Sequence, residues 1–150
     1  MSIGTARLET APAGGTTPAG GTTRAHTLTL WAGRSAVSIG GLHIAFFAVK
    51  ARPQWAGWLS GELHGVTDPD LHAEAVRLFW ALPGGFAVPL ILLGLLLARM
   101  ARTGQEVPRY VGWVLAGWVA LDGWILAPSG FPLGLVPAAL LILASRARRS

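Results

Sequence analysis

The sequence predicts an all-α fold, a polytopic membrane four-helix bundle, and three observations lead to this prediction. Hydrophobic residues make up 52% of the 150-residue chain and charged residues only 13%, which is too apolar for a soluble domain of this length. The apolar residues fall into four stretches of about the length of a spanning helix. The charges lie mostly between these stretches, where spanning helices would reach water.

Composition also excludes several kinds of site and partner. The chain has no cysteine, so disulfides and thiolate metal sites are impossible. Its 12 Lys and Arg residues outnumber the 7 Asp and Glu residues, but they separate apolar stretches and do not form a patch, which argues against nucleic acid as a partner. We therefore expect the lipid bilayer as the partner, and no cofactor.

The chain divides into a tail, a membrane domain and a short basic end. Residues 1–29 are rich in Gly, Ala, Thr and Pro and contain the hexad P-A-G-G-T-T twice in succession. Such a segment buries too little apolar surface to offset its ordering entropy, so we predict a disordered cytoplasmic tail, with a docking tail as the alternative. It lacks the apolar run of a signal peptide. The membrane domain follows at 30–145, and the basic cytoplasmic end at 146–150.

Four spanning helices are predicted, at about 31–51, 77–98, 110–127 and 131–144. The second should begin outside the membrane, with Asp68 as N-cap and Pro69 at the first helical position. It should kink or break just below Trp80, because Pro83 and Pro89 each remove a helix hydrogen bond.

A further short helix is predicted in the outer loop between the first two spans. Trp55, Trp58, Leu59 and Leu63 recur at the spacing of one helix face. We expect this helix to lie on the outer interface of the membrane, because tryptophan side chains favour that depth.

The arginines predict the orientation of the chain. One side of the predicted bundle carries most of them, and the other side carries fewer cations and four acidic residues, Glu62, Asp68, Asp70 and Glu74. The positive-inside rule then places both termini in the cytoplasm of a multi-pass cell-membrane protein. Binding of anionic phospholipid is the alternative reason for these arginines. The arginine-rich side comprises Arg7, Arg24, Arg34, Arg99, Arg102, Arg109, Arg146, Arg148 and Arg149.

Two pairs of short motifs indicate an internal duplication. W-x-G at 31–33 matches Y-x-G at 110–112, and P-x-G-F at 83–86 matches 128–131. The pattern predicts two parallel helix-hairpin repeats related by a pseudo-two-fold axis along the membrane normal. Convergent chemistry at helix starts is the alternative, since Gly and Pro are common in membrane helices.

His43 and Asp122 occupy equivalent positions in the two repeats, each ten residues after the glycine of its motif. Both would lie about 18 Å into a hydrocarbon core about 30 Å thick. Ionisable groups at that depth face the bundle interior and have a partner, so we predict a buried polar centre of His43 and Asp122. The two side chains would either contact each other directly or lie on opposite sides of an open pocket. The centre would be either a proton-handling or ligand-orienting dyad or a structural lock between helices.

Residues at a similar depth could line a pocket that opens to the outer leaflet. We assign Glu74, Arg77, Trp80, Trp118 and Trp124 to this pocket. No metal site is expected, because no spacing places two metal ligands on one helix face. No catalytic residue is assigned.

Small residues recur on two of the predicted spans, Gly41, Ala45 and Ala48 on the first and Gly112, Ala116 and Ala120 on the third. Such stripes allow helices to approach closely. The contact would be made either within the bundle or between two copies in a homo-oligomer.

Several motifs resemble those of an uncharacterised bacterial family of small four-span membrane proteins, a domain of unknown function. They are W-A-G-R at 31–34, His43, F-W-A-L-P-G at 79–84, R-x-V-G-W at 109–113 and F-P-L-G-L-V-P at 131–137. The resemblance covers about Trp31 to Ala144 and implies membrane location and topology, without an activity or a catalytic residue.

The function expected from these observations is that of a non-enzymatic or accessory membrane protein. The alternative is a membrane-embedded enzyme or small transporter that handles a lipophilic ligand in the outer pocket. In the enzyme, His43 and Asp122 would act as acid and base.

Overall fold

A computed structural model of the chain describes residues 19–65, 68, 70–126 and 129–149. Within these ranges the chain is all-α, as predicted, and contains no strand. The predicted tail is outside them up to residue 18. The elements are α1 (Ala19–Lys50), the 3-10 helix η1 (Arg52–Gln54), α2 (Trp55–Leu59), α3 (Ala73–Ala81), α4 (Ala87–Arg102), α5 (Arg109–Ile125), the 3-10 helix η2 (Phe131–Gly134) and α6 (Leu135–Ala147).

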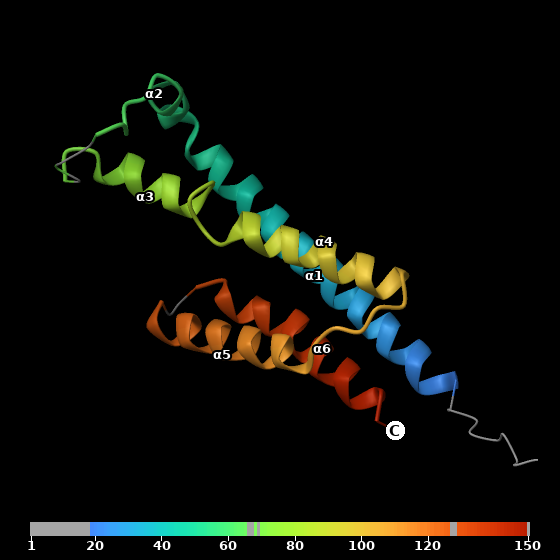
Figure 1. Cartoon of the computed structure of the whole chain (residues 1–150). Helices are drawn as coiled ribbons and strands as arrows, with labels where there is room; N and C mark the ends of the chain where they lie inside the picture. The colour runs from blue at the N-terminus through green and yellow to red at the C-terminus, as the bar shows by residue number, and fades with distance from the viewer. Residues whose placement is uncertain (1–18, 66–67, 69, 127–128, 150) are drawn as a thin grey trace, which may run out of the picture.

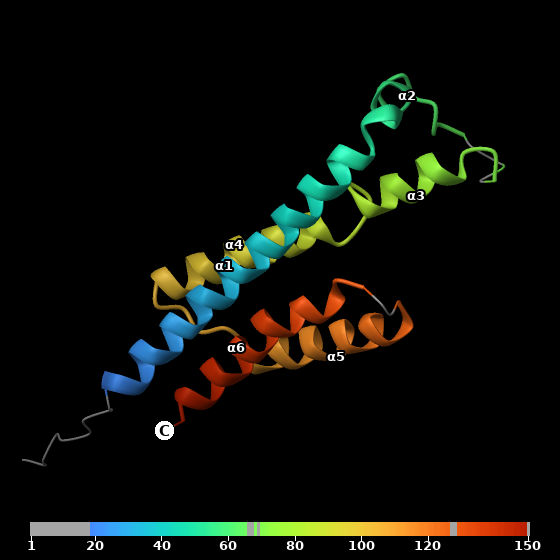
Figure 2. The same cartoon turned by 180° about the vertical axis from the view of Figure 1, so that it is seen from behind.

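The four longest helices form two antiparallel hairpins (Figure 1). In one hairpin α1 packs along α4, and in the other α5 packs along α6, while α1 also contacts α6. The view from behind shows that α1 starts and α6 ends at the same end of the molecule (Figure 2). At that end a Cβ atom on Gly21 would lie 2.8 Å from the Ala147 carbonyl oxygen. Helices α2 and α3 lie at the opposite end (Figure 1).

The two hairpins share one hydrophobic core. Its buried residues come from α1, α4, α5, α6 and the loop between α4 and α5. They are Ala32, Leu97, Val107, Leu115, Val119, Ala138 and Leu141.

Glycines allow the helices of each hairpin to touch. A Cβ atom on Gly33 would lie 2.5 Å from the Gly94 carbonyl oxygen, so α1 and α4 meet backbone to backbone. Gly112 brings α5 close to α6, because its added Cβ would be 3.0 Å from the Leu141 Cβ. Gly41, by contrast, has open space where its side chain would be. The predicted stripe through Gly41 is therefore not the face on which α1 packs, and contact between copies stays a prediction.

Helix α1 begins at Ala19, eleven residues before the expected start of the membrane domain at 30. Two threonine hydroxyls of this segment are satisfied inside the helix, because each donates to the carbonyl four residues earlier: Thr27 to Thr23 at 3.0 Å and Thr29 to Ala25 at 2.9 Å. Ala25 and Thr29 are buried. Composition suggested disorder for residues 19–29 because it does not reveal this tertiary packing.

The predicted second span is divided into two helices. The break below Trp80 is confirmed, because α3 ends at Ala81 and α4 starts at Ala87. The predicted start near Asp68 is wrong, since α3 begins at Ala73. The Asp68 carboxylate instead accepts the Asp70 backbone N–H at 3.1 Å, which makes a local turn.

A short helix forms in the outer loop where one was predicted. It covers Trp55–Leu59 and stops before Leu63, the last residue of the expected stripe. Leu59 is 88% exposed and Trp55 is 47% exposed. Its predicted place on the membrane interface stays a prediction.

One helix of the described residues, Gly20–Lys50, is long and apolar enough to cross a membrane by length and composition alone. Helices α4 and α5 have 16 and 17 residues, and Phe131–Ala147 is a shorter apolar helical stretch. Four spans therefore stay a prediction.

Candidate functional site

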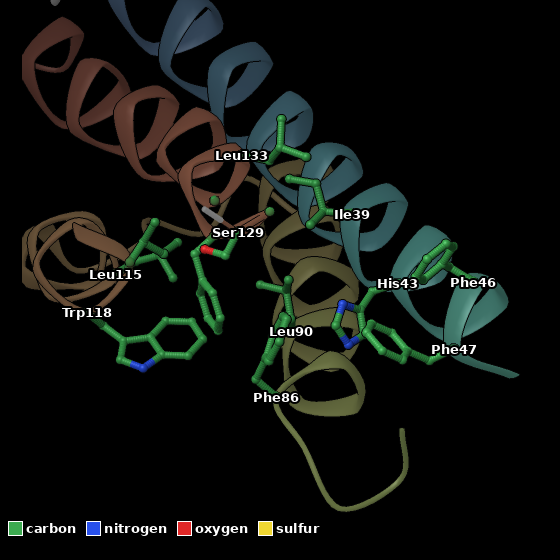
Figure 3. A pocket seen from close by; sticks show the side chains of 14 residues that line it. Ile39, His43, Phe46, Phe47, Phe86, Leu90, Leu115, Trp118, Ser129 and Leu133 are labelled. Carbon is green, nitrogen blue, oxygen red and sulfur yellow. The ribbon is translucent and has the colours of Figure 1, made fainter. Parts of the chain in front are cut away.

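A cavity of about 450 Å³ lies between the two hairpins, close to the break between α3 and α4 (Figure 3). α1 and α4 border it on one side, and α5 and the segment 129–134 border it on the other. Its lining is mostly hydrophobic. The lining residues are Ile39, His43, Phe46, Phe47, Phe86, Leu90, Leu115, Trp118, Val119, Ser129, Gly130, Phe131, Leu133 and Gly134.

Aromatic rings form one continuous wall of the cavity, with Phe86 at its centre. The centroid of the Phe86 ring lies 4.7 Å from that of His43, 5.9 Å from that of Trp118 and 5.0 Å from that of Phe131. Phe47 continues the wall on α1, with its ring centroid 4.6 Å from that of His43. Each distance is typical of favourable aromatic packing. The wall therefore connects the two hairpins.

The helix break next to the cavity leaves one backbone carbonyl without its helical partner. Pro83 has no N–H to donate to the Phe79 carbonyl, so the helix cannot continue regularly through this residue. In a continuous helix the Gly85 N–H would bond the Ala81 carbonyl. Here it lies instead 3.4 Å from the Leu82 carbonyl oxygen. The Ala81 carbonyl is thus available to another donor.

His43 on α1 provides that donor. Its Nε2 lies 2.8 Å from the Ala81 carbonyl oxygen. Because a carbonyl oxygen only accepts hydrogen bonds, Nε2 must carry the hydrogen and donate it. The bond links the middle of the first hairpin to the C-terminal end of α3, where a helix favours basic groups.

A direct contact between His43 and Asp122, one of the two expected arrangements, is not formed. Within the described part of the chain, no hydrogen bond or ion pair joins the two side chains. The Phe86 ring packs on both His43 and Trp118, so an aromatic side chain lies where the contact between α1 and α5 was expected. Asp122 is half-buried in the last part of α5 and does not border the cavity.

The residues expected to line one outer pocket occupy different places. Trp118 borders the cavity. Glu74 and Arg77 border a separate hollow, which lies between α3 and the end of α1. Trp80 borders another, beside the segment 58–64. Trp124 is 86% exposed. The break after Ala81 separates α3 from the main bundle, so depth along the chain did not predict which residues share a pocket.

Sequence reasoning missed Phe86 and Phe131 as site residues. Both are the phenylalanine of a P-x-G-F motif, which was noted only as a sign of duplication. Each directly precedes or begins a helix, α4 for Phe86 and η2 for Phe131. The repeated motif could therefore have predicted that Phe86 and Phe131 lie close together, because two equivalent helix starts can bring equivalent rings into contact.

A family model described as "Family of unknown function (DUF6463)" matches residues 27–148. The chain belongs to the DUF6463 family. The match extends a few residues beyond each end of the expected resemblance, Trp31 to Ala144. No curated protein and no solved structure matches the chain.

The DUF6463 match includes every residue that borders the cavity. The family description names no activity, so the site must be interpreted from its own geometry. Among the residues that the structure describes, no group of three or more His, Asp or Glu side chains is placed to hold a metal ion.

A second hollow of the DUF6463 region, of about 600 Å³, lies beside the end of α6 and the start of α5. Arg109, Arg148, Arg149 and Glu106 border it. Arg148 donates from Nη2 to the Val107 carbonyl oxygen at 2.8 Å. This bond ties the C-terminal end of α6 to the loop between the hairpins.

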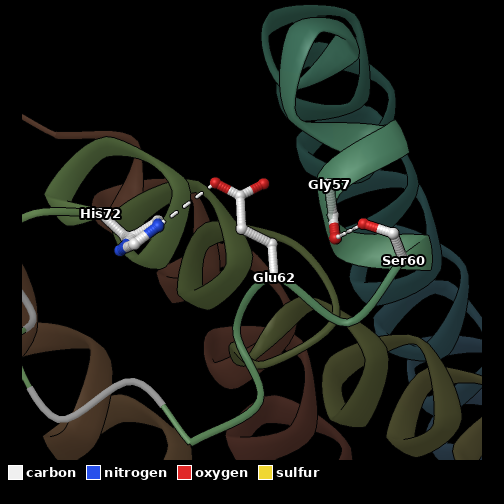
Figure 4. Close-up of polar contacts among 4 residues, drawn as sticks. All are labelled: Gly57, Ser60, Glu62 and His72. Carbon is white, nitrogen blue, oxygen red and sulfur yellow. Dashed lines mark hydrogen bonds and ion pairs between the residues drawn. The ribbon is translucent and has the colours of Figure 1, made fainter.

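The outer loop of this DUF6463 chain is tied to the start of α3 (Figure 4). His72 Nε2 lies 3.4 Å from Glu62 Oε1, and the Ser60 hydroxyl donates to the Gly57 carbonyl oxygen at 2.9 Å. The side chains of His72 and Glu62 are 33% and 39% exposed. An ion pair this exposed contributes about 0–1 kcal/mol, so it orients the loop more than it stabilises the fold.

Proposed function

We propose that this protein is a four-span integral membrane protein that binds a lipophilic molecule between its two hairpins. The observation that carries the proposal is the cavity of about 450 Å³ with its aromatic wall. Ligand sites are typically cavities of about 300–1,000 Å³ with mainly apolar walls and a few polar groups. His43 is such a group, because its ring is fixed by the bond to Ala81.

The exposed side chains support a membrane environment. Large apolar residues are exposed on α1, α4, α5 and α6 alike, and soluble proteins rarely expose so much apolar surface. In the most apolar 18-residue window of α1, only 22% of the residues are buried, whereas the core helix of a soluble protein would be mostly buried. Examples of the exposed residues are Leu42, Phe46, Leu92, Leu95, Leu96, Trp113, Val114, Leu121 and Leu143.

The shorter helices are compatible with spanning. At about 1.5 Å per residue, α4 and α5 would be roughly 24–26 Å long, compared with a hydrocarbon core of about 30 Å. Bilayers adapt to short spans by local thinning, and flanking Arg and Lys side chains reach outward to the interface. Arg99 and Arg102 lie in the last turn of α4, and Arg109 begins α5.

The distribution of charge supports a cytoplasmic location for both termini. At the end where α1 starts and α6 ends, most of the charged residues are arginines. The loop at the other end carries the acidic residues Glu62, Asp68, Asp70 and Glu74. The positive-inside rule then orients the arginine-rich end toward the cytoplasm of the cell membrane.

Equivalent contacts support the internal duplication. Gly33 and Gly112 each lie where the two helices of one hairpin touch. Phe86 and Phe131, equivalent in the P-x-G-F motifs, pack on each other with their ring centroids 5.0 Å apart. A duplicated hairpin would place the cavity at the interface of its two repeats, as in membrane proteins that bind ligands there.

Binding is favoured over acid–base catalysis because the required pair is not assembled. His43 is committed to Ala81 through Nε2, and Asp122 does not border the cavity. A transporter that moves the same ligand remains the second candidate, because the helix break at Ala81 adjoins the cavity. The homo-oligomer stays a prediction.

Photo-crosslinking tests the proposed function. The full chain, purified in detergent, is irradiated with a long-chain hydrocarbon that carries a diazirine, and the labelled peptides are identified by mass spectrometry. We expect labelling to concentrate on peptides that contain Ile39, Phe86 and Phe131.

Two matched variants show whether this labelling reports the cavity. Ile39→Trp adds volume inside the cavity and should lower the labelling of Phe86 and Phe131 several-fold. Leu42→Trp, on the same helix at a position that is 73% exposed, should leave it unchanged. Labelling spread evenly over exposed apolar residues, or insensitive to Ile39→Trp, would rule out a specific cavity ligand.

A further inference from the structure

The cavity offers few polar side-chain groups. Among its lining residues only His43, Ser129 and the indole of Trp118 carry one. Within the described part of the chain, no Asp, Glu, Lys or Arg side chain borders it. A ligand with a charged head group would therefore be buried without a countercharge, which is strongly unfavourable.

The bond to Ala81 determines what His43 offers to a ligand. Nε2 donates its hydrogen to the Ala81 carbonyl oxygen, so in the neutral ring Nδ1 holds a lone pair and acts as an acceptor. Nδ1 has no hydrogen-bond partner among the described residues. It is not fully buried either, because the buried side-chain atoms without a partner in these residues belong to Trp58 and His72. The ring is directed from α1 toward Leu90 and Phe86, in the lining of the cavity (Figure 3).

We propose that the cavity takes a neutral lipid alcohol, whose hydroxyl donates to Nδ1 of His43 while its hydrocarbon chain lies along the aromatic wall. This inference rests on the proposed function and specifies its ligand. An ether or a ketone of the same shape has no hydrogen to donate and leaves Nδ1 unpaired. An ionised carboxylate would place negative charge beside the Nδ1 lone pair. The fixed tautomer therefore selects for a hydroxyl.

The rings around His43 suit this ligand. Phe86, Trp118 and Phe131 pack on one another with centroid distances between 5.0 and 6.0 Å. They present an apolar surface that continues from His43 on one hairpin to Phe131 on the other. A chain lying along this surface would bury apolar area on both sides of the cavity.

The test compares an alcohol with its methyl ether as competitors of the diazirine probe. 1-Hexadecanol and hexadecyl methyl ether are titrated against labelling of the full chain at about pH 8, where a free imidazole is neutral. One hydrogen bond corresponds to roughly a fivefold to tenfold preference for the alcohol. The alcohol and the ether partition differently into detergent, but this difference is the same for every variant. It therefore cancels when the preference of the wild type is compared with that of a variant.

His43→Phe removes the acceptor and should abolish the preference, while the ether still competes and thereby reports an intact cavity. His43→Leu also carries no hydrogen-bond acceptor, so it should lose the preference too if His43→Phe fails to fold. His64→Phe, at an exposed position outside the cavity, is the control and should keep the preference. Ser129→Ala tests whether Ser129 binds the ligand's hydroxyl instead.

Equal competition by alcohol and ether in the wild type, or a preference that survives both His43 variants, overturns the inference. Loss of the preference in Ser129→Ala assigns the hydroxyl to Ser129 and overturns it as well. These outcomes overturn the recognition of a hydroxyl by His43, but they do not contradict the binding of a lipophilic molecule in the cavity. If neither compound competes and Ile39→Trp has no effect, the proposed function fails instead.

Discussion

His43 on α1 donates a hydrogen bond to the carbonyl oxygen of Ala81, across 2.8 Å and 38 positions of sequence. The acceptor is free because Pro83 ends the regular hydrogen bonding of α3. One side chain thus completes the end of a helix and, through the same ring, borders the cavity. The helix break and the proposed binding site depend on the same residue.

Replacing His43 tests the structural half of this arrangement. His43→Phe keeps a ring but leaves the part-buried Ala81 carbonyl oxygen without this donor, which should cost about 1 kcal/mol, the lower end of the penalty for an unsatisfied buried acceptor. His43→Gln retains an N–H near the position of Nε2 and should recover most of the loss. The free energy of unfolding of the purified protein measures both effects.

An exposed histidine serves as the control for this substitution. His64→Phe, in the outer loop where the side chain is exposed, should change the free energy of unfolding by less than about 0.5 kcal/mol. Equal effects of His43→Phe and His64→Phe would refute the importance of the bond to Ala81.

The close contact between α1 and α4 predicts that a glycine-to-alanine substitution has opposite effects on stability at Gly33 and at Gly41. Gly33→Ala places a Cβ atom 2.5 Å from the Gly94 carbonyl oxygen, so the helices must separate, at a cost of about 1–3 kcal/mol. Gly41→Ala meets no atom within 4 Å and should raise stability by up to about 1 kcal/mol, because alanine favours a helix. Thermal unfolding of the two variants compares them, and a more stable Gly33→Ala would contradict the backbone contact.

Asp122 distinguishes the observed arrangement from the expected polar lock. Because Asp122 has no hydrogen bond or ion pair with His43, Asp122→Asn should change the free energy of unfolding by less than about 0.5 kcal/mol. Breaking a buried pair would cost about 3–5 kcal/mol. A loss of about 3–5 kcal/mol in the free energy of unfolding would instead support a polar lock between Asp122 and His43.

Features that local chemistry decides could be predicted from the sequence. Pro83 predicted the break below Trp80, and the spacing of Trp55, Trp58 and Leu59 predicted α2. The start of α1 could not be predicted, because burial of Ala25 and Thr29 depends on a fold that brings distant segments together.

The candidate site was predicted only in part. Depth along the helices led to the prediction that His43 has a partner, but it did not identify that partner as a backbone carbonyl. That carbonyl becomes available only because α3 ends at Ala81. Asp122 has an equivalent position in the sequence and a different environment, because Phe86 packs between its helix and His43.

Cysteine accessibility tests most directly whether the chain crosses the membrane four times. The chain has no cysteine, so Ser60→Cys, Gln105→Cys, Gly130→Cys and Arg149→Cys each introduce a single thiol. With a membrane-impermeant maleimide on intact cells, we predict labelling of Ser60→Cys and Gly130→Cys, and labelling of Gln105→Cys and Arg149→Cys only after permeabilisation. Labelling of all four in intact cells, as expected if α1 alone spans the membrane, or of none, would contradict the proposed four spans.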